Sequence, residues 1–194
     1  LCRTIFKQIF YTIKYIHQRD IAHLDIKPFV FFIGDSFELK LGRFEHAQRK
    51  QDQQSHSLGS RFYRAPEIKK GLCEDIFAAD IYSLGVLLFV IRTGGMIPHT
   101  ENSLVKGIDL FNLLNFHNED FWKEQCEILK VNSRFFSEDF KSLFNSMVAL
   151  NPKKRATLSD IEKSKWFNGR TLNEKEYHKT MMSFFETESM ISID

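Results

Sequence analysis

The sequence predicts a mainly α-helical fold with one small β-hairpin, and three observations support this class. Apolar side chains recur at helical spacing over residues 2–18. Two short β-prone runs, 29–33 and 37–41, enclose a Gly-Asp-Ser turn. A later segment, 80–92, is apolar on almost every side. A helix of that kind belongs at the centre of a domain, so we expect the other helices to pack around it.

Composition and charge narrow the class of protein. The chain has 194 residues, of which 43% are hydrophobic, and this is enough for one sizeable core. The net charge of +2 gives no reason to expect nucleic acid or an anionic membrane as a partner. The longest apolar run is about a dozen residues, shorter than the roughly 20 that span a bilayer. Three cysteines without metal-ligand spacing suit reduced thiols, so we expect an intracellular, cytoplasmic protein.

The first third of the chain opens inside a helical pattern. Isoleucines at positions 5, 9, 13 and 16 form one stripe of the helix expected over residues 2–18. Because the pattern is already established at the first residue, we expect further residues upstream of Leu1. After the hairpin, residues 48–60 are polar and lack periodicity, which predicts an exposed loop.

The second half of the chain is expected to be mostly helical. Glycines in Thr-Gly-Gly, residues 93–95, end the central helix. Amphipathic segments near 104–114, 121–129 and 138–150 predict further helices, and the many phenylalanines are expected in the core.

The last part of the chain shows one helix start and a looser tail. Thr157 and Asp160 predict a capping box that opens a short helix running to Trp166. We therefore place one domain at residues 1–168 and a C-terminal tail at 169–194, with a short helix near 177–185.

Five short motifs follow one another along the chain. They are HLDIKPFV (23–30), RFE (43–45), APE (65–67), DIYSLG (80–85) and NPKKRAT, which contains Arg155. In this order they resemble the C-terminal lobe of the eukaryotic protein kinases, serine/threonine type, in which the catalytic loop reads H-R-D-x-x-x-x-N, the magnesium motif D-F-G and a later motif A-P-E. The resemblance covers residues 1 to about 168 and implies a protein-kinase-like C-lobe, with the N-lobe absent from this chain.

The resemblance assigns catalytic positions to Asp25 and Lys27. Asp25 occupies the family position whose carboxylate accepts the proton of the substrate hydroxyl. Lys27 occupies the position of a lysine that contacts the transferred phosphoryl group. A structural alternative remains open, in which the two side chains only hold loop hydrogen bonds and a local salt bridge.

Other motif residues are expected to build the lobe. By resemblance, Glu67 and Arg155 form a buried ion pair, and Asp80 receives backbone amides of the catalytic loop. Asp80 is also a suitable N-cap for the central helix. His23 and Ser60, in HLD and GSRFYRAPE, complete the set of structural positions.

Three departures from the motifs affect metal binding. Val30 replaces the asparagine that ligates a second magnesium ion, and valine offers no oxygen. Arg43 replaces the aspartate that would hold both ions. A unit cation near a divalent ion is repelled by roughly 8 kcal/mol at about 4 Å with a dielectric of about 20. Glu45, in place of a glycine, could supply a substitute ligand, and Arg43 could contact phosphate directly.

One further change affects regulation by phosphorylation. Leu24 replaces an arginine that would read a phosphate on the activation segment, so Ser55 or Ser57, if phosphorylated, would lack that partner. By default, both serines are ordinary loop residues.

The leading hypothesis is a pseudokinase that keeps the scaffold and has a scaffold or regulatory role with a protein partner and without a cofactor. The alternative is an active serine/threonine kinase that transfers the γ-phosphate of ATP to protein, with magnesium and with an N-lobe upstream of Leu1. Metal-free nucleotide binding through Arg43 and a truncated gene product without selected activity also remain open. The sequence contains no glycine-rich phosphate loop and no strand lysine in a V-A-I-K context.

Overall fold

The structure of the chain is a computed structural model, and it describes most but not all residues. The described parts are 1–52, 59–69, 71, 73–98, 104–105, 108–109 and 119–191. Ser55 and Ser57, the serines considered for phosphorylation, lie outside them.

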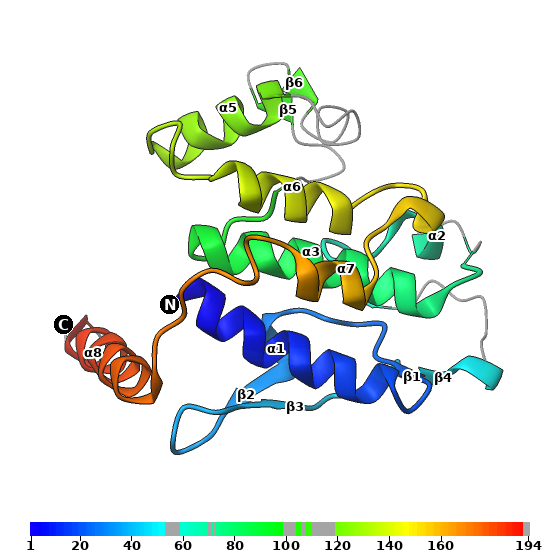
Figure 1. Cartoon of the computed structure of the whole chain (residues 1–194), viewed down its shortest axis with the longest axis horizontal. Helices are drawn as coiled ribbons and strands as arrows, with labels where there is room; N and C mark the ends of the chain where they lie inside the picture. Colours follow the sequence, from blue (N-terminus) through cyan, green and yellow to red (C-terminus); the bar gives the residue numbers. More distant parts are fainter. Residues whose placement is uncertain are drawn as a thin grey trace.

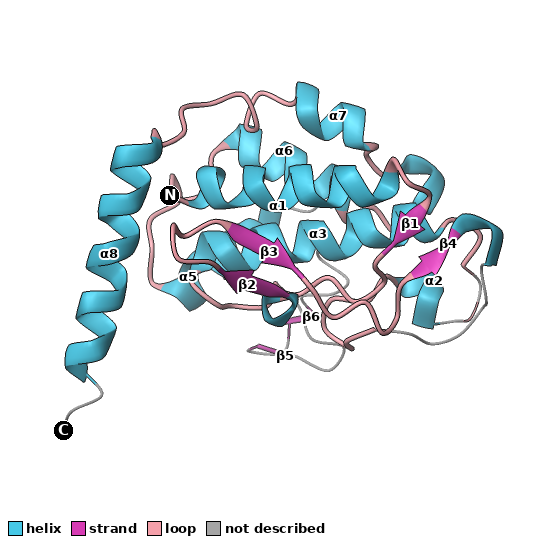
Figure 2. Ribbon diagram, turned by 90° about the horizontal axis from the view of Figure 1, so that it is seen from below, coloured by secondary structure: helices cyan, strands magenta, loops and turns pink. Residues whose placement is uncertain are grey.

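The fold is mainly helical, as predicted, with three small two-stranded sheets among the described residues (Figures 1 and 2). The α-helices are α1 (Cys2–His17), α2 (Pro66–Lys69), α3 (Ile76–Thr93), α5 (Glu119–Leu129), α6 (Glu138–Met147), α7 (Leu158–Lys163) and α8 (Glu174–Ile191). The strands are β1 (Ile21–Ala22), β2 (Phe31–Ile33), β3 (Leu39–Leu41), β4 (Gln48–Arg49), β5 (Leu104–Val105) and β6 (Ile108–Asp109). Single 3-10 turns are Pro28–Val30, Lys50–Asp52 and Pro152–Lys154.

Helix α3 forms the centre of the fold and differs in extent from the prediction. It begins four residues before Asp80, and its N-cap is Asp75, whose carboxylate accepts the amides of Phe77 and Ala78. The prediction that Asp80 caps the helix is therefore wrong, because the carboxylate of Asp80 is used by a different segment. Gly94, in the left-handed conformation at φ 71°, ends the helix as predicted.

Helix α3 is also longer than the apolar run counted in the sequence. With 18 residues, it is long and apolar enough to cross a membrane by length and composition alone. However, 72% of the helix is buried inside the protein, as in the core helix of a globular domain.

Helices α1 and α6 pack on opposite sides of α3 (Figure 1). A side chain at Gly85 would place its Cβ 2.9 Å from the Cβ of Met147, so the glycine allows α3 and α6 to approach closely. Beyond this contact, the rings of Phe89 and Phe136 stack at 5.4 Å. The expectation of a phenylalanine-rich core holds here, but it is wrong for Phe29 and Phe32 in the hairpin segment, which are 78% and 51% exposed.

The predicted hairpin is present as β2 and β3, which pair in antiparallel register with Phe31 opposite Leu41. The polar segment 48–60 is not entirely a loop, because β4 at its start pairs with β1. The helix predicted near 104–114 is wrong where the structure describes it, since β5 and β6 pair as strands; the remainder of that segment lies outside the described residues.

The C-terminal part contains the predicted capping box and a longer helix than predicted. Thr157 Oγ1 accepts the amide of Asp160, whose carboxylate accepts the amide of Thr157. Helix α7 ends at Lys163, before Trp166. Helix α8 is longer than the predicted 177–185 and lies at the edge of the molecule (Figure 2). It is attached to the hairpin by the hydroxyl of Tyr177, which donates to the carbonyl oxygen of Phe37 at 2.9 Å.

Candidate functional site

The loop after β1 is fixed by hydrogen bonds to the carboxylate of Asp80, which is fully buried. The amides of His23 and Leu24 donate to its two oxygens at 2.7 and 2.8 Å. The ring Nε2 of His17, at the end of α1, lies 2.8 Å from the same carboxylate. Leu24 has φ 61°, a left-handed conformation that costs a branched residue about 1–2 kcal/mol. The two charge-assisted hydrogen bonds offset that cost and fix the direction of the loop.

His23 connects the loop to the segment that follows β3. Its side chain is fully buried, with Nε2 at 2.9 Å from the carbonyl oxygen of Gly42. The amide of Asp25 donates to Nδ1 at 3.3 Å, so the neutral ring carries its proton on Nε2. The ring also packs against Phe44 at 5.1 Å. Residues 23–25 and 42–44 are thereby held together.

The structure brings Asp25, Lys27 and Ser60 into one polar cluster. Lys27 Nζ lies 2.6 Å from Asp25 Oδ2 and donates to Ser60 Oγ at 2.5 Å. The amide of Ser60 donates to Asp25 Oδ1 at 2.6 Å. Both oxygens of a carboxylate that is only 8% exposed are thus occupied. The cluster can position a hydroxyl group, and its hydrogen bonds also hold residues 25–27 against residue 60.

Gly59 makes this cluster possible and was not singled out from the sequence. It has φ 83°, and a Cβ at this position would lie 2.2 Å from the carbonyl oxygen of Leu24. Only glycine allows the backbone of residues 59–60 to come close enough for the Ser60 amide to reach Asp25. The signal available in the sequence was a glycine directly before Ser60 in a polar segment. His17 was missed as well, because its partner Asp80 lies 63 positions away.

The pKa of Asp25 reflects two opposing effects. Burial acts to raise it, but the hydrogen bonds from Lys27 and Ser60 together with the charge of Lys27 lower the pKa below its ordinary value. The carboxylate is therefore ionised at neutral pH.

We expect Asp25→Asn to make the free energy of unfolding less dependent on pH. A carboxyl group whose pKa is lowered by folding stabilises the protein above its unfolded pKa of about 3.9 and loses that contribution as the pH falls through the folded value. The difference between wild type and Asp25→Asn should therefore be constant near neutral pH and shrink below about pH 4. Urea unfolding at several pH values measures it. Asp35→Asn, in the exposed hairpin turn, is the control, and an equal change in both variants would contradict the assignment.

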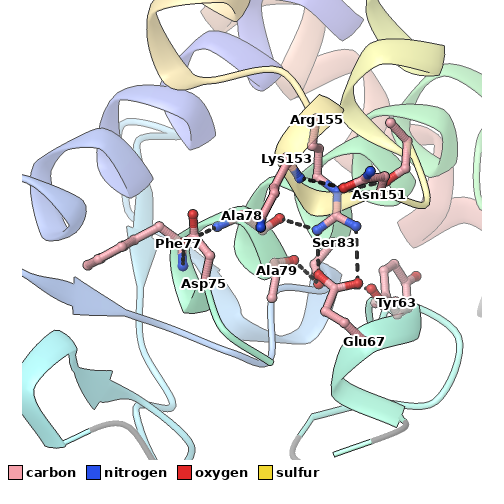
Figure 3. Close-up of polar contacts among 11 residues, drawn as sticks. Tyr63, Glu67, Asp75, Phe77, Ala78, Ala79, Ser83, Asn151, Lys153 and Arg155 are labelled. Carbon is pink, nitrogen blue, oxygen red and sulfur yellow. Dashed lines mark hydrogen bonds and ion pairs between the residues drawn. The ribbon is translucent and has the colours of Figure 1, made fainter. Parts of the chain in front are cut away.

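A second polar cluster joins the segment after Ser60 to Arg155, which follows the 3-10 turn Pro152–Lys154 (Figure 3). Arg155 Nη1 and Nη2 lie 2.6 and 3.1 Å from the two carboxylate oxygens of Glu67. Arg155 also donates to the carbonyl oxygens of Ala78, at 2.7 Å, and Ala149, at 3.0 Å. Both charged side chains are buried, at 5% and 8% exposure. The pair ties α2 and α3 to the 3-10 turn Pro152–Lys154. The hydroxyl of Ser83, on α3, donates to the carbonyl oxygen of Tyr63 at 2.8 Å.

The residues expected on the metal side do not join the Asp25 cluster. Val30 is fully buried and presents no side-chain oxygen. Arg43 and Glu45 are exposed, and within the described part of the chain neither side chain makes a hydrogen bond or an ion pair. Among the described residues, no group of three or more His, Cys, Asp or Glu side chains could hold a metal ion. These residues do not fit the oxygen-rich, anionic environment that magnesium requires.

Comparison with known proteins identifies the family of the chain. The family model described as "Protein kinase domain" matches residues 1–167. A probable serine/threonine-protein kinase, KCC4 of Saccharomyces cerevisiae, is 33% identical over 80% of this chain and 14% of its own length. CBL-interacting protein kinase 12 of rice is 29% identical, covering 98% of this chain and 32% of its own length. Serine/threonine-protein kinase cds1 of Schizosaccharomyces pombe is 29% identical, covering 97% and 40%.

This chain therefore spans well under half the length of these relatives. The match to the family model extends over most of the chain and includes all five motifs. The chain belongs to the protein kinase family.

Proposed function

We propose that the chain is the C-terminal lobe of a pseudokinase, a protein kinase scaffold that has lost metal-dependent phosphoryl transfer and acts as a scaffold or regulatory module for a protein partner. The observation that carries the proposal is Val30. Its side chain is wholly buried at the motif position where the family has a magnesium ligand. A buried valine can neither ligate a metal nor leave space for a ligand at the same place.

Arg43 and Glu45 support the same proposal. The exposed guanidinium of Arg43 replaces an anion with a permanent cation. A divalent ion close to it would meet repulsion of several kcal/mol at an effective dielectric of about 20. If nucleotide binds without a metal, we expect Arg43 to contact a phosphate group, because a guanidinium matches phosphate oxygens in bidentate geometry.

The alternative, an active serine/threonine kinase with ATP and magnesium as cofactors, is favoured by one specific observation. Asp25, Lys27 and Ser60 form an ordered cluster around an ionised carboxylate. The same arrangement could orient the hydroxyl of a protein substrate. Under both proposals, the N-lobe lies outside the 194 residues and the protein is expected to be intracellular.

Phosphotransfer and nucleotide binding by the full-length protein test the two proposals. We expect no transfer from ATP with magnesium or manganese to a generic protein substrate, and no increase in nucleotide affinity when magnesium is added to a chelator-treated sample. Transfer that Asp25→Asn abolishes would overturn the pseudokinase proposal.

Back-substitution tests the cause of the loss. The triple variant Val30→Asn, Arg43→Asp and Glu45→Gly of the full-length protein should gain magnesium-dependent nucleotide affinity of about tenfold or more, since two ligands are added and one repulsive charge is removed. The matched control, Val30→Ala, Arg43→Ala and Glu45→Gly, removes the charge without adding ligands and should gain less. An equal gain in both variants would show that ligands are not what is missing.

A further inference from the structure

A cavity of about 330 Å³ lies away from the Asp25 cluster, at the end of the molecule where α1 begins and α3 ends. The start of α6 and the segment that follows α7 come to the same end (Figure 1). Four arginines line the cavity, Arg3, Arg92, Arg134 and Arg170, and no aspartate or glutamate is among its lining residues. We call it the arginine cavity. Neither the motifs nor the proposed function uses it.

Two of the arginines are positioned by neutral partners. Arg3 donates from Nε to the carbonyl oxygen of Trp166 at 2.5 Å and from Nη1 to that of Arg170 at 2.6 Å. Arg92 donates to the carbonyl oxygen of Phe135, and its guanidinium lies 3.9 Å from the centre of the Phe135 ring. These contacts fix the direction of each guanidinium without a carboxylate to cancel its charge. Both guanidinium groups are thus held in place and keep N–H donors that these contacts do not use.

The other two arginines are more exposed. Arg170 pairs with Glu176 at 3.0 Å, with 81% of the arginine side chain exposed, so this pair is largely screened by solvent. The side chain of Arg134 makes no hydrogen bond or ion pair within the described part of the chain. Among the described residues, Arg170 is the one arginine of the four that pairs with a carboxylate, so the cavity carries a strong positive charge. Burial raises the pKa of the adjacent Cys2 thiol to about 11, while the charges of Arg92 and Arg3 act to lower it.

The first turn of α6 adds to the positive potential of the same cavity. Ser137, a lining residue, is the N-cap of this ten-residue helix. The N-terminal end of a helix carries a partial positive charge and favours a bound anion. Two acidic residues, Glu138 and Asp139, follow in the first turn, and Glu138 is paired with Lys141 at 2.8 Å.

We propose that the arginine cavity binds a phosphate monoester, as the side chain of a phosphoserine or phosphothreonine in a peptide segment. The guanidinium fork matches phosphate oxygens in bidentate geometry, and phosphopeptides are commonly recognised by arginine clusters. The cavity lies within the size range of small-ligand sites, which accommodates a phosphorylated side chain. Its concave form, walled by Phe135 and Trp166, favours a side chain over an extended flat polyanion. The proposal does not depend on whether the protein transfers phosphate.

Calorimetric titration of the full-length protein tests the site with three probes: acetyl-Ala-Ala-phosphoserine-Ala-Ala-amide, the same peptide without phosphate, and inorganic phosphate. We expect the phosphopeptide to bind and the unmodified peptide not to bind. The double variant Arg134→Gln/Arg170→Gln should weaken phosphopeptide binding about tenfold or more, because it removes two of the four guanidinium groups that line the cavity. Both positions are exposed, so the variant should fold normally.

The control variant Arg19→Gln/Arg49→Gln removes the same charge at exposed positions outside the cavity and should leave affinity unchanged. Equal loss in both variants, binding of the unmodified peptide with the same affinity, or no binding of either phosphate probe would overturn the proposal. If inorganic phosphate binds as tightly as the phosphopeptide, the cavity is an anion site and its assignment to a peptide is overturned.

Discussion

Replacing Arg155 with alanine should lower the free energy of unfolding by about 3–5 kcal/mol, because a buried ion pair is broken from one side. The substitution would leave the carboxylate of Glu67 buried and unpaired, and the carbonyl groups of Ala78 and Ala149 without a donor. Thermal unfolding followed by circular dichroism should show a fall in Tm of roughly 6–20 °C for a domain of this size.

Two further variants distinguish the loss of the ion pair from a general loss of stability. Lys153→Ala, two positions earlier and exposed, should change the free energy of unfolding by less than about 0.5 kcal/mol. The double variant Glu67→Leu/Arg155→Met removes both charges and should lose less than Arg155→Ala, since no uncompensated charge stays buried. A loss below about 1 kcal/mol for Arg155→Ala would mean that water reaches Glu67 in solution.

Replacing Asp80 with alanine should cost about 3 kcal/mol or more and should release the loop that carries Asp25. The amides of His23 and Leu24 would each lose a charged acceptor, and an unsatisfied buried donor costs about 1–3 kcal/mol. Without these bonds, nothing described compensates for the left-handed conformation of Leu24. Hydrogen exchange should therefore accelerate at the amides of residues 23 and 24 more than in α1.

Asp75→Ala is the matched control, because it removes a carboxylate from the same helix. Loss of an N-cap should cost about 1 kcal/mol, and exchange at residues 23 and 24 should stay unchanged. If both variants accelerate exchange at these two amides equally, Asp80 does not hold the loop specifically and general loosening of α3 is the cause.

The regular elements that the sequence predicted well are those with strong local patterns. The helix expected over residues 2–18 is α1, and the runs around Gly-Asp-Ser form β2 and β3, because period and turn chemistry depend only on neighbouring residues. The errors arise where local patterns are ambiguous. An aspartate near the start of an apolar run predicts an N-cap, but both Asp75 and Asp80 satisfy that description, and long-range contacts decide between them.

The candidate site was only partly predictable for a related reason. Motif spacing identified Asp25, Lys27 and Ser60, but the contacts among them require a backbone approach that Gly59 permits. A close approach between residues 24 and 59 depends on how two segments cross in space. No periodicity or composition records such a crossing, so the glycine directly before Ser60 did not by itself indicate the close approach.

The sequence by itself determined the protein kinase family and the chemistry of the altered motif positions, since an arginine is a cation and a valine lacks an oxygen wherever they lie. Only the tertiary structure decided that Val30 is wholly buried, that Arg43 is exposed, and that Arg155 reaches Glu67 across 88 positions. It also brought Arg3 within hydrogen-bonding distance of residue 170, across 167 positions. Side-chain burial and convergence of charge depend on the packing of segments distant in sequence, and that packing is set by the whole core.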